Sequence, residues 1–147
     1  MKIATIAAKN AKDELELAYA PEALVVRLGD WKDKKLEIEP GYWRKGRGYR
    51  HGLTDRVFED SVRAWWNVAE NARGVRYIVA VHRGITVGVF KIDQEVGWLT
   101  DMEGKRACKV TRLYSGSAYD AWFGTHGRNV KDLFDRGHQN PFGYFPK

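Results

Sequence analysis

The chain has one cysteine, few prolines and no long apolar run, and each shortage excludes a class of protein. Cys108 cannot form an internal disulfide or, by itself, a structural zinc site, so core packing has to supply the stability. No segment approaches the ~20 apolar residues that a membrane-spanning helix needs. The apolar stretch at residues 1–9 is short, and a Lys-Asp-Glu segment follows where a signal peptide would be cleaved. We therefore expect a soluble, cytoplasmic protein.

The chain also lacks internal repeats, low-complexity tracts and linkers rich in serine or proline. Its length of 147 residues and its 44% hydrophobic content fit one average globular domain. Six Trp, seven Tyr and six Phe provide large side chains for its core. We predict a single domain over residues 1–147, with residues 1–20 as a candidate N-terminal extension.

Positive charge is concentrated in one segment. The net charge is +6, and residues 41–56 carry +4 of it. In this segment cations alternate with aromatic rings and glycines, a composition that suits phosphate neutralisation, base stacking and close backbone approach. A solvated basic loop is the alternative interpretation. The cations are Arg44, Lys45, Arg47, Arg50 and Arg56, and the rings are Tyr42, Trp43 and Tyr49.

The apolar pattern predicts alternating helices and strands. Residues 55–71 form the clearest helix, because Phe58, Val62 and the Trp65-Trp66 pair fall at helical spacing, with Thr54 as N-cap. His82-Arg83-Gly84 between two apolar runs indicates a hairpin whose glycine supplies a positive φ. We predict further helices at 10–19 and 129–134, strands at 3–7, 22–28, 35–39, 77–81, 85–92, 105–114 and 142–145, and loops at 41–54 and 115–127.

From residue 61 onward the chain resembles short prokaryotic proteins and accessory domains of unassigned function, some of which occur beside a nuclease module. The resemblance rests on Arg63-Ala64-Trp65-Trp66, on the hairpin from Tyr77 to Ile85, and on a closing Gly137-His138-Gln139-Asn140-Pro141. A Gly-Lys-Ser-Val turn of that pattern has no match here, so a role for its lysine does not transfer.

The hairpin with Gly84 and Gly88 is also similar to the sheet of PUA-like domains, the superfamily of the ASCH, EVE and YTH modules. That resemblance implies an α+β fold with a small, mixed, barrel-like sheet and flanking helices. It also implies a pocket that holds an extruded or modified base between aromatic side chains.

We therefore expect a nucleic-acid-binding module, for DNA or RNA, that needs no cofactor and no metal. In this hypothesis the 41–56 segment holds phosphates together with Arg112 and Arg128, a tryptophan takes a base, and an amide tests its edge. The tryptophan candidates are Trp43, Trp98 and Trp122, and the amide candidates are Gln139 and Asn140.

Two other functions remain open. Asp93, Glu103 and Lys105 follow the order of a metal-dependent nuclease core, in which carboxylates hold a divalent cation and a lysine helps to activate water. A protein-interaction factor, such as a phage-type inhibitor, would instead dock its basic loop on an acidic protein surface. The four histidines are scattered and have no cysteine cluster beside them, so a zinc site is not expected.

Overall fold

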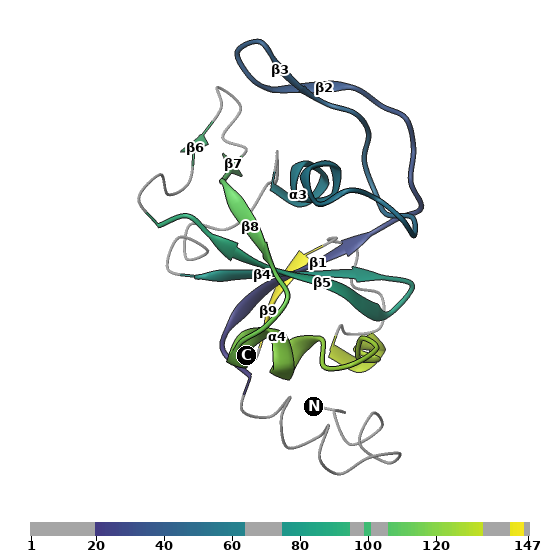
Figure 1. Ribbon diagram of the computed structural model, residues 1–147, viewed down its shortest axis with the longest axis vertical. Coiled ribbons are helices and arrows are strands. Elements are labelled where there is room, and N and C mark those ends of the chain that lie inside the picture. The colour runs from purple at the N-terminus through teal and green to yellow at the C-terminus, as the bar shows by residue number, and fades with distance from the viewer. Residues whose placement is uncertain (1–19, 64–74, 95–98, 101–105, 134–141, 146–147) are drawn as a thin grey trace.

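A five-stranded mixed sheet forms the centre of the computed structural model (Figure 1), which describes residues 20–63, 75–94, 99–100, 106–133 and 142–145. The strand order is β8-β5-β4-β1-β9. β1 pairs in parallel with β4, and the other neighbours are antiparallel. The strands are β1 (Ala23–Leu28), β4 (Tyr77–His82), β5 (Ile85–Ile92), β8 (Val110–Leu113) and β9 (Phe142–Phe145). The strands predicted at 22–28, 77–81, 85–92 and 142–145 are confirmed.

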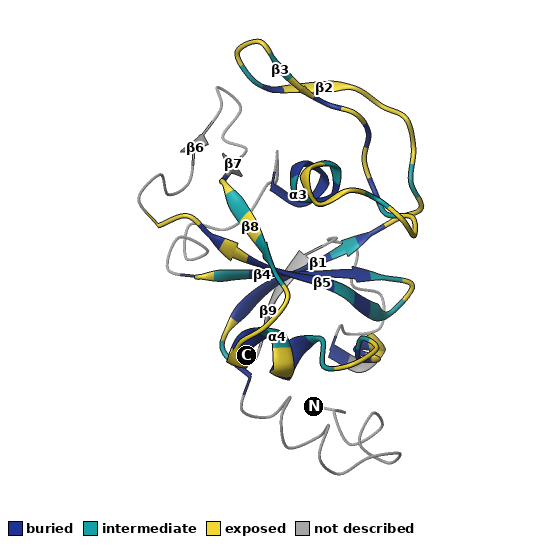
Figure 2. Cartoon of the chain, viewed as in Figure 1, coloured by how far each residue is buried: buried dark blue, intermediate teal, exposed yellow. Residues whose placement is uncertain are grey.

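Both faces of the sheet are covered. Successive side chains of a strand point to opposite faces, and the central strands have apolar residues at consecutive positions. In β1, Leu24 and Val26 pack into a cluster with Phe58 and Val62 of helix α3 (Asp55–Arg63). The intervening Val25 packs on the opposite face, with helix α4 (Ser117–Trp122). Figure 2 shows the dark, buried centre of the sheet between these two helices. The fold is a mixed α+β arrangement of three layers.

The barrel that the PUA-like resemblance implied is not observed, which corrects that expectation. β8 and β9 are the two ends of the strand order and do not pair with each other, so the sheet is open. β1 lies in the interior of the sheet, between β4 and β9, and a parallel pair with a long connection places helix α3 against one face.

Local signals in the sequence account for helix α3 and for the β4–β5 hairpin. The N–H of Val57 donates to Oγ1 of Thr54 over 3.4 Å, which confirms the predicted N-cap. The hairpin turns at Arg83 (φ 52°) and Gly84 (φ 82°), the pair of positive φ angles that a two-residue turn needs. His82, expected at the turn, instead ends strand β4.

Two predicted segments differ from the structure. Residues 115–127, expected as loop, contain helix α4, because Ala118, Ala121 and Trp122 form a buried stripe against the sheet. The strand predicted over 105–114 is divided into β7 (Arg106–Ala107), which pairs with β6 (Leu99–Thr100), and β8, which joins the main sheet. The short helix predicted after Asn129 is a 3₁₀ turn, η2 (Lys131–Leu133), with the Lys131 N–H donating to the Asn129 side chain.

A second, two-stranded sheet stands apart from the main one. Strand β2 (Leu36–Glu39) matches the strand predicted at 35–39, and β3 (Tyr42–Arg44) pairs with it where a loop was expected. Pro40-Gly41 forms the turn, with Gly41 at φ 77°. We call residues 29–50, which contain this hairpin and the two chain segments leading to it, the arm; in Figure 1 it projects over helix α3.

None of the helices in the described part of the chain is long and apolar enough to cross a membrane.

Candidate functional site

Strand β3 gives the arm two different faces. Its side chains alternate, so Tyr42 and Arg44 turn towards the body of the protein, where Arg44 is buried. Trp43 lies on the other face and is 55% exposed, which is unusual for so large an apolar ring. Trp43 borders a shallow hollow of about 540 Å³ with Lys35, Arg44 and Lys45. The outer face therefore combines a flat indole with two exposed ammonium groups.

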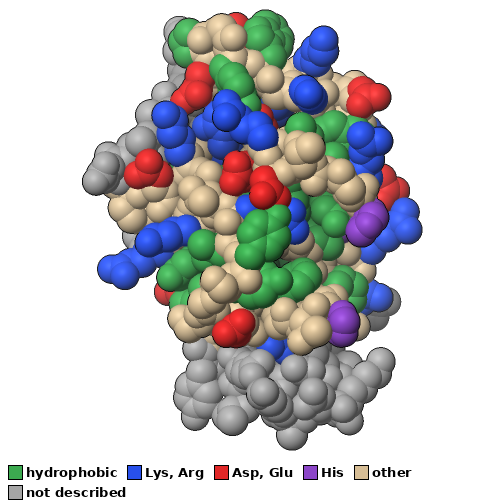
Figure 3. Space-filling model, viewed as in Figure 1, with side chains coloured by type: hydrophobic (Ala, Val, Ile, Leu, Met, Phe, Trp, Pro, Cys, Tyr) green, Lys and Arg blue, Asp and Glu red, His purple; other side chains and the backbone are tan. Residues whose placement is uncertain are grey.

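Exposed cations continue along the arm on both sides of this hollow. Arg47 and Arg50 are exposed, as are three lysines in the segment leading to β2. The guanidinium of Arg50 lies 5.7 Å from the centre of the Trp31 ring, a cation–π contact. In Figure 3 Lys and Arg side chains are spread over the upper half of the visible face, where the arm and helix α3 lie. The lysines are Lys32, Lys34 and Lys35.

The base of the arm is fixed by backbone hydrogen bonds. The N–H of Trp31 donates to the carbonyl of Tyr49 over 2.9 Å, and Lys32 and Arg47 exchange two further bonds. Gly48 has φ +86°, and a Cβ there would lie 2.6 Å from the Asp30 carbonyl oxygen. Only glycine fits at position 48, where the chain passes the backbone of Gly29 and Asp30, without displacing that backbone.

Two side chains join this base to the sheet. Asp30 accepts hydrogen bonds from Arg83 at 3.1 and 3.3 Å and pairs with His82 Nε2 at 2.7 Å. The contact with Arg83, and then that with His82, lowers the pKa of Asp30 below its usual value. The Tyr49 ring packs against Phe58 of helix α3 and His82 of β4 at 5.0 and 5.2 Å. The arm is therefore anchored to both the β4–β5 hairpin and helix α3.

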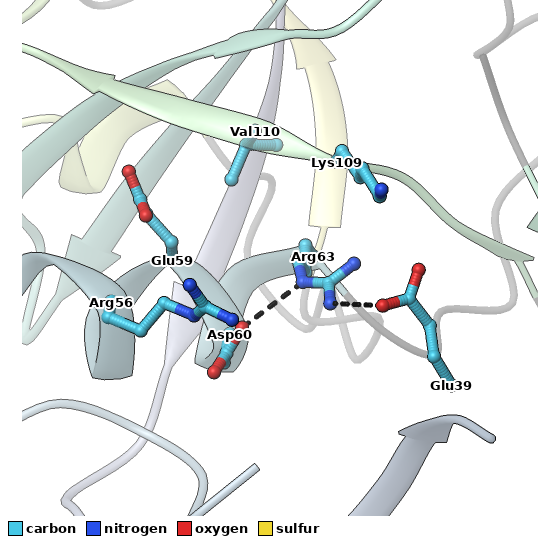
Figure 4. Close-up of a pocket in the computed structure, with 7 residues that line it drawn as sticks. All are labelled: Glu39, Arg56, Glu59, Asp60, Arg63, Lys109 and Val110. Atoms are coloured by element: carbon cyan, nitrogen blue, oxygen red, sulfur yellow. Dashed lines mark hydrogen bonds and ion pairs between the residues drawn. The ribbon is translucent and has the colours of Figure 1, made fainter. Parts of the chain in front are cut away.

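The inner face of the arm encloses a second, charged pocket of about 230 Å³ against helix α3 (Figure 4). Buried Asp60 accepts from the Tyr42 hydroxyl at 2.5 Å and from Arg63 Nε at 3.2 Å. Arg63 also donates to Glu39 of β2 at 3.3 Å and to the Cys108 carbonyl at 3.2 Å. The lining residues are Glu39, Arg56, Glu59, Asp60, Arg63, Lys109 and Val110.

This network also shifts the pKa of Tyr42. Burial, and then the hydrogen bond that Tyr42 donates to Asp60, raises the pKa of the Tyr42 hydroxyl. The neutral hydroxyl therefore persists as a donor over the ordinary pH range. Because Arg63 makes three hydrogen bonds from a side chain that is only 8% exposed, the helix side of the pocket is firmly held.

Three residues expected to contact nucleic acid are buried and have contacts within the protein. Trp122 lies in helix α4 rather than in a loop; it is 1% exposed, and its Nε1–H donates to the Pro21 carbonyl at 2.8 Å. Arg128 is buried and donates to the carbonyls of Ala121 and Asp120. Burial lowers the pKa of Arg44, which forms part of the wall of the outer hollow but exposes little of its side chain. These three positions do not present free groups to a ligand.

Arg112 is held by contacts within the chain. Its guanidinium lies 4.9 Å from the centres of both the Phe58 and Tyr114 rings and donates to Asp55 at 3.2 Å. Among the described members of the predicted set, Trp43, Lys45, Arg47 and Arg50 are exposed on the arm.

Several predicted residues lie outside the described part of the chain. They include Trp98, Gln139 and Asn140 of the proposed base pocket, Glu103 and Lys105 of the alternative nuclease, and the helix pair Trp65 and Trp66. Asp93 is described and borders a separate shallow hollow with Lys91 and Thr111. Within the described residues, no cluster of three or more His, Cys, Asp or Glu side chains could hold a metal ion.

The charged pocket was missed by the sequence interpretation, although a signal for it exists. Arg56, Glu59, Asp60 and Arg63 have the i, i+3, i+4 and i+7 spacing of one helix face. Only the apolar face of this helix was considered in the sequence interpretation. Charges on one helical face form a site only when another element covers them. Here strand β2 does so through Glu39; the strand was predicted, but its position against helix α3 was not.

Comparison with protein-family models, curated proteins and solved structures finds no match to this chain.

Proposed function

We propose that this protein binds single-stranded nucleic acid through the outer face of the arm. The observation that carries the proposal is the exposed Trp43 indole beside Lys35 and Lys45. A flat ring can stack on any base, and flanking cations neutralise phosphates, which is the combination that single-strand binding uses.

The anchoring of the arm supports this function. An indole that is held in place loses little conformational freedom when a base stacks on it, which preserves binding free energy. Its strand is fixed on the inner side by Tyr42 and at its base by the backbone bonds of Trp31, Lys32 and Arg47. The exposed cations lie on the same hydrogen-bonded element, so their backbone positions are held near the ring.

The salt dependence of binding tests the electrostatic part. We expect the affinity of the full chain for a labelled thymidine oligomer to fall linearly with salt on logarithmic axes. Replacing Lys45, Arg47 and Arg50 together by alanine should flatten this slope by about 0.7 for each phosphate that the variant no longer neutralises. Fluorescence anisotropy across a salt series measures both slopes.

A matched control is Lys91→Ala, which removes an exposed cation from strand β5, outside the arm. It should leave the slope within error of the parent. Absence of binding to the oligomer, or an affinity that does not respond to salt, would disprove the proposed function.

A further inference from the structure

The charged pocket on the inner face of the arm has no part in the stacking surface just described. Its volume of about 230 Å³ is below the roughly 300–1,000 Å³ typical of sites for drug-sized ligands. Its lining carries both hydrogen-bond donors and acceptors. Such a space suits one small, planar, polar group better than an extended or apolar ligand.

Part of the lining is already saturated by contacts within the chain. Asp60 accepts from Tyr42 and Arg63, and Arg63 distributes its donors among Asp60, Glu39 and the Cys108 carbonyl. These groups form the fixed side of the pocket. A ligand therefore has to be recognised by the other lining residues.

Three lining side chains keep hydrogen-bonding capacity. Arg56 donates its Nε–H to the Tyr42 hydroxyl and keeps its two terminal amino groups. Lys109 is exposed, and its ammonium makes no hydrogen bond or ion pair with any residue that the structure describes. Glu59 uses Oε2 to accept the N–H of Arg112 at 2.8 Å, while no described residue donates to its Oε1. In Figure 4 Glu59 and Lys109 lie on different sides of Arg63. The pocket thus presents a carboxylate with a guanidinium beside it on one side and an ammonium on the other.

This division of donor and acceptor matches one nucleobase best. Guanine offers two adjacent N–H groups, at N1 and N2, to a carboxylate, which is an acceptor only. It also offers two adjacent acceptors, O6 and N7, to a lysine or arginine. Adenine, cytosine and thymine each lack one of these two pairs. A mixed carboxylate and ammonium lining therefore discriminates in favour of guanine.

We infer that the charged pocket receives an unpaired guanine base, whose N1–H and N2–H groups donate to Glu59 and whose O6 accepts from Lys109. The inference rests on the proposed function, because the arm supplies the general affinity for the strand. Trp43 and Tyr42 are neighbours on β3 and serve opposite faces, so a strand that crosses the arm can stack one base outside and insert another inside.

The test compares thymidine oligomers that are identical except for one central base. We expect a single guanine to raise the affinity of the full chain about tenfold, equivalent to about 1.4 kcal/mol. Hypoxanthine at that position, which lacks the N2 amino group, should recover only part of the gain. Adenine and cytosine should give none. Fluorescence anisotropy at one fixed salt concentration measures all five strands.

Two variants assign the effect to the pocket. Glu59→Gln keeps an amide oxygen for the Arg112 N–H but loses the carboxylate, and Lys109→Met keeps the length of an exposed side chain without its charge. Each should abolish the preference for guanine and leave the affinity for the plain thymidine oligomer unchanged. Lys91→Met is the matched control and should retain the preference.

The outcomes separate the two proposals. Equal binding of strands with and without guanine, or a preference for another base, would overturn the guanine pocket and leave the arm intact. A guanine preference that survives both pocket variants would also overturn it. Failure to bind any strand would overturn the proposed function and this inference together.

Discussion

At the scale of single residues, two tryptophans expected to do the same work have opposite environments. Trp43 exposes 55% of its surface on a short strand, whereas Trp122 exposes 1% and satisfies the Pro21 carbonyl. Aromatic residues are usually buried, so composition alone cannot tell which ring serves the core. Burial separates a stability role from a binding role.

Truncating each ring to alanine should show this separation. Trp122→Ala should lower the free energy of unfolding by about 3–5 kcal/mol, because it opens a cavity and leaves a carbonyl without its donor. Trp43→Ala should change stability by no more than about 0.5 kcal/mol but cost about 1–3 kcal/mol of binding to a thymidine oligomer. Urea denaturation and anisotropy titration measure the two quantities.

An equally exposed ring outside the arm serves as the control. Tyr114 is 58% exposed and follows strand β8. Tyr114→Ala should leave the affinity of the oligomer unchanged. A reduction equal to that of Trp43→Ala would mean that exposure alone, rather than position on the arm, explains the effect.

At the scale of elements, the attachment of the arm depends on Gly48, whose replacement we expect to lower stability. Gly48 and Gly52 have nearly the same backbone conformation, with φ of +86° and +87°. A Cβ at Gly48 would collide with the carbonyl oxygens of Asp30 and Gly29 at 2.6 and 2.7 Å, whereas nothing lies within 4 Å of a Cβ at Gly52. Comparing substitutions at the two glycines therefore separates the effect of backbone crowding from that of the left-handed conformation.

Alanine at each position should therefore give different results. Gly52→Ala should cost about 1–2 kcal/mol of stability, because alanine is strained in a left-handed conformation, and should retain binding. Gly48→Ala should cost more and weaken binding, because the chain must move apart where Tyr49 and Trp31 are hydrogen-bonded. Thermal unfolding and anisotropy test the difference, and equal effects of the two substitutions would contradict this account of the arm.

At the scale of the whole molecule, Cys108 reports on the integrity of the fold. It is fully buried beside helix α3, where its N–H donates to the Arg63 carbonyl, and burial raises the pKa of its thiol to about 12. A raised pKa means less of the reactive thiolate, about one part in ten thousand at pH 8. The thiol should then react only when the protein opens.

We expect alkylation of Cys108 at pH 8 to be very slow in water and to accelerate with urea in parallel with the disappearance of native circular dichroism. Mass spectrometry after timed quenching measures the rate. Rapid alkylation in the absence of urea would show that the packing of helix α3 against β8 opens locally.

The sequence was sufficient for the parts of this architecture that depend on local patterns. Apolar runs located β1, β4 and β5, and Thr54 with Phe58 located the start of helix α3. Helix α4 was missed because it has only six residues and begins at the last residue of Ser115-Gly116-Ser117, a typical loop composition. The open sheet was missed because closure depends on pairings between distant strands, which no local spacing encodes.

The candidate site divides in the same way. The basic and aromatic composition located the arm, and the exposed Trp43, Lys45, Arg47 and Arg50 lie on it. Composition could not show that Arg44 faces inward, because the alternation of β3 was not predicted. The charged pocket needed the approach of β2 to helix α3, a contact formed only in three dimensions.

The position of strand β9 also bears on how this chain is assembled during synthesis. β9 pairs with β1 in the register Ala23 to Phe145, so the first described strand is joined by the last. During translation the edge of β1 is exposed until residues 142–145 leave the ribosome, and such unpaired edges can join to other chains. Pairing of strands so far apart in the sequence is also slow, because the chain loses conformational entropy when the loop closes, before the strand contacts form. The edge of β1 is therefore open to pairing with other chains until β9 has been made and has joined it.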